Sequence, residues 1–152
     1  MKKYSLIFLL LIFLFSCEDE SVDITVMPEA TTEGADTFGC LVDGWIYVGG
    51  RYFDMELKYR WTQPSIEFKY HEGENILFVH VILKPQISIS FEIPEPEEGV
   101  CLMKNVSWNN ESMDDCVVII SRFDKEARII SGEFDGGRIT FGRFDVNYSL
   151  RP

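Results

Sequence analysis

The sequence predicts an all-β fold, an antiparallel β-sandwich or partly open barrel of about eight or nine strands. Apolar and polar residues alternate strictly over residues 52–61. Further alternating or apolar runs recur roughly every 8 to 12 residues, with Gly, Pro, Asn or Asp between them. No stretch shows a sustained helical period. Because the chain has 152 residues, of which 46% are hydrophobic, it suits one domain with its own core.

The first 16 residues are expected to be a lipoprotein signal peptide. Lys2 and Lys3 give it a basic start, and the apolar run at residues 6–15 is about half as long as a membrane-spanning helix. Residues 14–17, LFSC, resemble a bacterial lipobox, although the residue two places before the cysteine is unusually bulky. The resemblance implies cleavage before Cys17 and its acylation, and several acyl chains make a stable membrane anchor. An ordinary secretory peptide is the alternative.

The mature chain is expected to begin with a tether. Over residues 17–36 the composition changes to acids, Thr, Ala and Gly without periodicity, as is typical of a flexible segment. A short edge strand at Val22–Val26 is an alternative for part of it. Residues 37–152 are expected to form the single β domain.

The strands within this domain are expected from alternation and turn residues. Asp43-Gly44 predicts a tight hairpin turn, and the sequence HEGEN at residues 71–75 predicts a second hairpin. The second arm of that hairpin is apolar on both faces, which predicts a central strand. The arms of the Asp43-Gly44 hairpin are residues 39–42 and 45–48, and the strands expected after it are residues 52–61, 66–70, 76–83, 87–93, 100–108, 116–123, 128–134 and 138–148.

Two details of the later strands give local tests. The apolar residues change parity between Phe141 and Phe144, so we expect a β-bulge near Gly142 and Arg143. Phe-Asp pairs occur at residues 53–54, 123–124, 134–135 and 144–145. We expect in each case a core Phe followed by an Asp that opens a turn.

The charge disfavours nucleic acid as a partner. The formal net charge is −11, and because Lys2 and Lys3 lie in the expected leader, which has no acid, the remainder carries −13. The other basic residues are spread singly rather than clustered. A surface of this kind repels phosphate backbones and favours solubility.

Two blocks resemble a family: PEATTEGADTFGCLVDGWIYV at residues 28–48 and IISGEFDGGRITFGRFDVNY at residues 129–148. They are similar to an uncharacterised family of small lipoproteins of the Bacteroidota, with Trp45 as one departure. The resemblance implies a cell-envelope lipoprotein with a β domain and no known activity. It also implies that Glu18, Asp19 and Glu20 form an export signal that carries the lipoprotein to the outer membrane, facing the cell exterior.

The remaining cysteines could form one disulfide in an exported protein. Cys101 and Cys116 flank a polar loop and are the expected pair, worth roughly 3 kcal/mol if the geometry allows. Cys40 is expected to be a small core residue. Three free thiols are the alternative.

No motif in the sequence predicts catalysis. His71 and His80 lack metal-ligand or nucleophile spacing. The acids Glu95, Glu97, Glu98, Asp114 and Asp115 lack the spacing of a calcium loop and are expected to be solvated turns. No catalytic residue, metal ligand or cofactor is therefore assigned.

Trp108, beside the polar stretch NNES, is the ring expected to be exposed, where it could stack on a sugar. Ordinary packing is the alternative. The favoured function is thus a surface-exposed, non-enzymatic binding module for an extracellular glycan, peptide or protein. An accessory subunit of an envelope or adhesin assembly is the second hypothesis, with a sheet edge that accepts a partner strand. A small carboxylate-based hydrolase is the least favoured.

Overall fold

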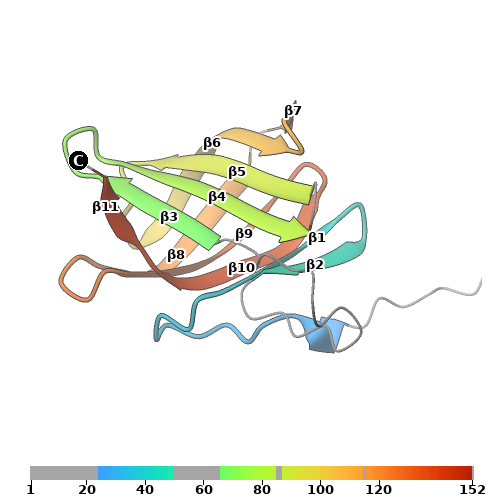
Figure 1. The fold of residues 1–152 in the computed structure, drawn as a ribbon, viewed down its shortest axis with the longest axis horizontal. Helices are drawn as coiled ribbons and strands as arrows, with labels where there is room; N and C mark the ends of the chain where they lie inside the picture. The colour runs from blue at the N-terminus through green and yellow to red at the C-terminus, as the bar shows by residue number, and fades with distance from the viewer. Residues whose placement is uncertain (1–23, 50–65, 85–86, 115, 152) are drawn as a thin grey trace, which may run out of the picture.

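The computed structural model describes residues 24–49, 66–84, 87–114 and 116–151. Within these residues one curled sheet forms a half-barrel, so the all-β prediction is confirmed (Figure 1). The strand expected at residues 52–61 lies outside the described residues. The elements are η2 (Ile24–Val26), β1 (Thr37–Val42), β2 (Trp45–Gly49), β3 (Ile66–His71), β4 (Ile76–Lys84), β5 (Ile87–Pro94), β6 (Gly99–Trp108), β7 (Glu111–Ser112), β8 (Cys116–Asp124), β9 (Ile129–Gly136), β10 (Ile139–Asn147) and β11 (Ser149–Arg151).

The sheet has the order β11-β3-β4-β5-β6-β8-β9-β10-β1-β2, with β7 paired to β6. All described pairs are antiparallel except β11 with β3. β6 joins the two halves of the sheet, because its first part pairs with β8 and its last part with β5. Figure 1 shows β3, β4 and β5 lying across from β8, β9 and β10, so the concave face of each half covers the other.

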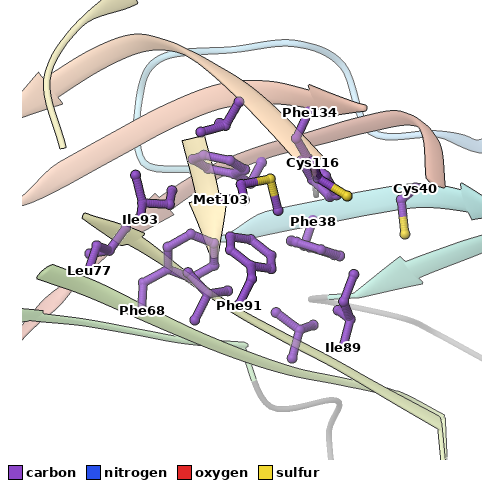
Figure 2. Packing of buried hydrophobic residues seen from close by; sticks show 14 of the residues in the cluster. Phe38, Cys40, Phe68, Leu77, Ile89, Phe91, Ile93, Met103, Cys116 and Phe134 are labelled. Atoms are coloured by element: carbon purple, nitrogen blue, oxygen red, sulfur yellow. The ribbon is translucent and has the colours of Figure 1, made fainter. Parts of the chain in front are cut away.

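The core fills the space between these two halves. Figure 2 shows the side chains of Phe38, Phe68, Phe91 and Phe134 gathered there. The ring of Phe134 lies 5.5 Å from that of Phe38 and 5.6 Å from that of Phe91, between ring centres. Tilted ring pairs at this spacing are favourable beyond the area they bury, so the aromatic residues of opposite strands hold the halves together.

Both predicted hairpins are present. Asp43 and Gly44 join β1 to β2 with φ angles of 51° and 80°, the two left-handed residues of a type I′ turn. β4 lies between β3 and β5, so its central place in the sheet is confirmed. Its outer face is not covered, however, since His80 and Ile82 are exposed.

The predicted bulge lies in β10. The pairing of β10 with β9 is irregular between Ile139 and Gly142, and Phe141 has a φ of 52°. The extra residue brings Ile139 and Phe144 onto the inner face, where both are buried. Phe141 instead lies outside and is 54% exposed, so it is the residue that the bulge expels.

Part of the segment expected to be a flexible tether, residues 24–36, is described, and it contacts the β domain. Ile24–Val26 is one 3-10 turn rather than the edge strand considered for Val22–Val26. Residues 27–36, here called the N-terminal strap, lie on the outer face of β1, β9 and β10 and reach Arg122 of β8. Met27 is buried against Gly39, and the guanidinium groups of Arg122 and Arg143 donate to strap carbonyls.

Asp145 is the main attachment point of the strap. Its carboxylate accepts hydrogen bonds from the backbone N–H of Glu33, Gly34 and Ala35, at 2.9, 2.8 and 3.2 Å. The hydroxyls of Thr31 and Ser131 also donate to it, at 2.5 and 2.6 Å. Asp145 is only 1% exposed. It therefore does not open a turn, as the Phe-Asp pattern predicts, but satisfies an irregular segment that has no ladder partner.

These hydrogen bonds also set the ionisation of Asp145. Burial alone would raise the pKa of the carboxyl group. The hydrogen bonds from Ser131, Thr31 and the backbone of Glu33 and Gly34 outweigh burial and lower the pKa to about 2. Asp145 is thus charged at neutral pH, and its charge strengthens each of these bonds.

Candidate functional site

The most distinctive surface feature is a block of four exposed aliphatic side chains on β6 and β8. Val100, Leu102, Val117 and Ile119 are 71%, 63%, 41% and 54% exposed. They lie outside because Cys101 and Met103 on β6, like Cys116, Val118 and Ile120 on β8, alternate with them and fill the core. We call these four residues the aliphatic patch.

The patch is continuous because the strand register places its members side by side. Val100 lies opposite Ile119, and Leu102 lies opposite Val117. Directly opposite residues of an antiparallel pair are about 5 Å apart at Cβ. The four side chains therefore form one apolar surface rather than scattered exposed residues, which would need no explanation.

Acidic residues border the patch. On β9, Glu133 lies opposite Ile119 and Asp135 lies opposite Val117, and both are exposed. Glu98 precedes the first residue of β6, and Asp114 lies just before β8; both are exposed as well. The patch is thus an apolar centre with acids along one flank and near both ends.

Lys104, Arg122 and Arg143 also lie near the patch, and each has an acid close to it, which for Arg122 is Asp124. Lys104 follows Leu102 on the outer face of β6 and lies opposite Glu92 of β5. Arg143 lies opposite Glu133 on β10, and its guanidinium donates to the Pro28 carbonyl of the strap at 3.1 Å. The net charge of the residues around the patch therefore stays negative.

The expectation of an exposed Trp108 is wrong. Trp108 is 7% exposed, and its ring packs edge-on against Tyr47 with 4.8 Å between ring centres. An irregularity near Asn105, whose φ is 52°, changes the parity of β6 and brings Val106 and Trp108 inward. Of the two tryptophans that the structure describes, Trp45 is instead the exposed one, at 70%, because it follows directly after the Asp43-Gly44 turn.

The expected disulfide between Cys101 and Cys116 is absent. Cys40, Cys101 and Cys116 are all buried, and none of them is in a disulfide. Cys101 lies opposite Val118 and Cys116 lies opposite Met103, so the two cysteines are diagonal neighbours, about 7 to 8 Å apart, which is too far for a disulfide. Burial raises the pKa of the Cys40 thiol to about 12, which keeps it protonated and unreactive.

The acids considered for calcium do not lie together, because Asp114 lies at the opposite end of the β6–β8 pair from Glu98, and Asp115 lies outside the described residues. Glu95, Glu97 and Glu98 line an open hollow of about 480 Å³ together with Asn75, Pro96, Phe123 and Lys125. The ammonium of Lys125 lies 5.5 Å from the ring centres of Phe123 and Tyr70. In the described part of the chain, no three His, Cys, Asp or Glu residues are close enough to hold a metal ion.

The two histidines do not meet. His71 accepts a hydrogen bond from the backbone N–H of Glu74 at 3.0 Å through Nδ1, so it shapes the β3–β4 turn. His80 lies opposite Glu67, four residue pairs along the same ladder. It faces outward and lines a second open hollow of about 320 Å³ with Ser88, Asn109 and Asn110 among others.

The proposed anchor lies outside the described residues, as do Cys17 and the acids Glu18, Asp19 and Glu20. Among the residues that the structure describes, no helix has the length and apolar character needed to cross a membrane.

The fold and its outer surface define an all-β half-barrel with a docked N-terminal strap and an uncovered aliphatic patch. A comparison with family models, curated proteins and solved structures found no match for this chain. The site therefore has to be interpreted from its own chemistry. Sequence reasoning missed the patch, although its signal was present: residues 100–103 and 116–120 are apolar at nearly every position, not at alternate ones.

Proposed function

We propose that this protein is a non-enzymatic binding module of a bacterial cell envelope, anchored by lipid at Cys17 and facing the cell exterior from the outer membrane. The observation that carries the proposal is the aliphatic patch. Exposed apolar side chains gathered at one place on an otherwise acidic domain favour an interaction surface, because water disfavours such a cluster.

The strap supports the anchored arrangement. Met27 is only ten positions beyond Cys17 in the sequence, and from Met27 onward the chain is fastened to the sheet. At most about 3.5 Å per residue separates the two ends of such a stretch. A lipid on Cys17 would thus hold the domain within roughly 35 Å of the membrane surface.

The anchoring part of the proposal is tested in cells. Radiolabelled palmitate should enter the full chain and should not enter the Cys17→Ala variant. Replacing Glu18, Asp19 and Glu20 by Ala should leave the label in place and protect the protein from protease added to intact cells. If the triple variant is shaved as fast as the parent, the three acids do not direct surface export.

The binding part is tested by photo-crosslinking on intact cells. A photoreactive amino acid at position 100, in the patch, should give a discrete adduct under ultraviolet light. The same amino acid at position 82, on the outer face of β4, is the matched control and should not give it. Equal crosslinking from both positions, or no adduct from position 100, would contradict a binding role for the patch.

A further inference from the structure

The aliphatic patch has a chemistry that selects among binding partners. Its four side chains are all branched aliphatic groups, and Val100 and Leu102 are more than half exposed. They can offer dispersion contacts and area removed from water but no hydrogen bond. Specificity must therefore come from the border of the patch.

That border carries acids along one flank and near both ends of the patch. Glu133 and Asp135 lie one strand away on β9, directly opposite patch residues. Glu98 and Asp114 lie near the two ends. Acids on one flank and near both ends of an apolar surface attract basic groups and disfavour acidic ones, because like charges repel at an interface.

Three occupants fit this combination poorly. A glycan binds best to aromatic rings, which the four patch residues lack. A second copy of the chain would bring a second acidic border to the same interface, since an isologous contact uses the same surface of both copies. An anionic membrane surface would meet the same acids and be repelled.

We propose that the patch binds a protein segment that carries apolar side chains flanked by Lys or Arg. This inference rests on the proposed binding function and specifies its partner. The apolar side chains of the partner cover Val100, Leu102, Val117 and Ile119. Its basic side chains reach Glu133 and Asp135 on the flank, which fixes its direction across β6 and β8.

Fluorescence anisotropy with defined peptides tests the inference. The protein is the complete chain from residue 17 with Cys17→Ala, which removes the lipid. The probes are labelled peptides of equal length that alternate Leu with Lys, Leu with Glu, or Ser with Lys. The Leu/Lys peptide should bind at least about tenfold more tightly than either of the others, and added salt should weaken its binding.

Two matched double variants locate the binding. L102T/I119T replaces two patch residues by a residue with a good strand propensity, and it should weaken Leu/Lys binding at least about tenfold. I82T/L150T replaces two exposed residues on β4 and β11, which are 38% and 39% exposed, and it should bind as the parent does. Circular dichroism of both variants checks that the sheet is intact.

Several outcomes would overturn the inference. Equal binding of the Leu/Lys and Ser/Lys peptides would mean that the protein recognises only their charge. Unchanged binding of the Leu/Lys peptide by L102T/I119T would mean that the peptide binds outside the patch. A dimer in sedimentation velocity that L102T/I119T abolishes would make a second copy the occupant. If the parent protein floats with vesicles of phosphatidylglycerol and phosphatidylethanolamine and L102T/I119T does not, the occupant of the patch is a membrane surface.

The two proposals can fail separately. If position 100 crosslinks in cells but the peptides show no preference for Leu/Lys, the binding function stands and the partner chemistry is wrong. If position 100 does not crosslink above position 82, the binding function itself fails, whatever the peptides do.

Discussion

Two neighbouring regions of the same outer sheet surface differ in what lies on them. Over β1, β9 and β10, the N-terminal strap covers Ser131 and Asp145, which are 0% and 1% exposed. One step away, on β6 and β8, the aliphatic patch stays open. The covered region presents hydroxyl and carboxylate groups, whereas the open region presents only aliphatic groups.

The difference shows how each region can be used. An irregular segment such as the strap needs partners for its backbone N–H groups, and Asp145 supplies them for three consecutive residues. The patch cannot satisfy a backbone in this way. It suits a partner whose own backbone is already paired and which contributes side chains.

Removing the strap should have the largest effect on stability. A chain that begins at Thr37 loses the burial of Met27 and four of the five hydrogen bonds to the Asp145 carboxylate, which then faces water with Ser131 as its one remaining donor among the described residues. We expect the free energy of unfolding to fall by about 3 to 5 kcal/mol, measured by urea denaturation. A chain that begins at Met27 is the control and should lose less than about 1 kcal/mol.

An undiminished midpoint for the chain that begins at Thr37 would show that the strap rests on the sheet without stabilising it.

Asp145→Asn should have the next largest effect. The amide carries no charge and turns an NH2 group toward groups that donate hydrogen bonds, so some donors lose their acceptor. We expect a loss of about 2 to 4 kcal/mol. Asp135→Asn is the matched control, because Asp135 is exposed on the neighbouring strand and accepts only from the backbone of Phe141; it should cost about 1 kcal/mol or less.

Comparable losses from the two Asn variants would mean that the hydrogen bonds of Asp145 are not special.

Acid should weaken the strap. The pKa of Asp145 is about 2 in the folded chain and 3.8 in its ordinary state, so the unfolded chain takes up a proton first. The stabilising contribution is therefore fully present above about pH 4 and is lost as pH falls through 2. The free energy of unfolding should fall more steeply over this range for the parent than for Asp145→Asn.

Parallel curves for the two proteins below pH 4 would exclude Asp145 as the titrating group.

Changing the patch should have the smallest effect on stability. The variant V100T/L102T/V117T/I119T keeps a strand-forming residue at each position and alters only exposed side chains. We expect the free energy of unfolding to change by less than about 1 kcal/mol, although the photo-crosslink in cells should be lost. A drop of several kcal/mol would mean that the patch is part of the folding core.

Local signals account for what the sequence predicts correctly. The Asp43-Gly44 turn, the HEGEN turn and the parity change in β10 are each visible within a few residues, so the hairpins and the bulge follow from them. The prediction that Trp108 is exposed is wrong because the local signal there is too weak. The irregularity at Asn105 reverses parity in β6, and the sequence there offers only an Asn between a Lys and a Val.

Long-range contacts account for most of what was missed. The composition of the strap, with its polar residues and Gly, is typical of a disordered segment. The strap is nevertheless stabilised by hydrogen bonds to a residue more than 100 positions away, which composition does not reveal. Cys101 and Cys116 are close in the ladder, but only the register shows that they are diagonal rather than opposite. Pairing register is set by the whole sheet, and composition does not reveal it.

The position of Asp145 in β10 also determines when the strap can dock during folding. A polypeptide that emerges N-terminus first exposes residues 27–36 long before β10 exists, so the strap has nothing to dock on until almost the last strand is made. Closing a loop of this length is slow relative to forming hairpins. The strap thus stays accessible while the domain is incomplete, and its docking on the sheet reports that β10 has formed.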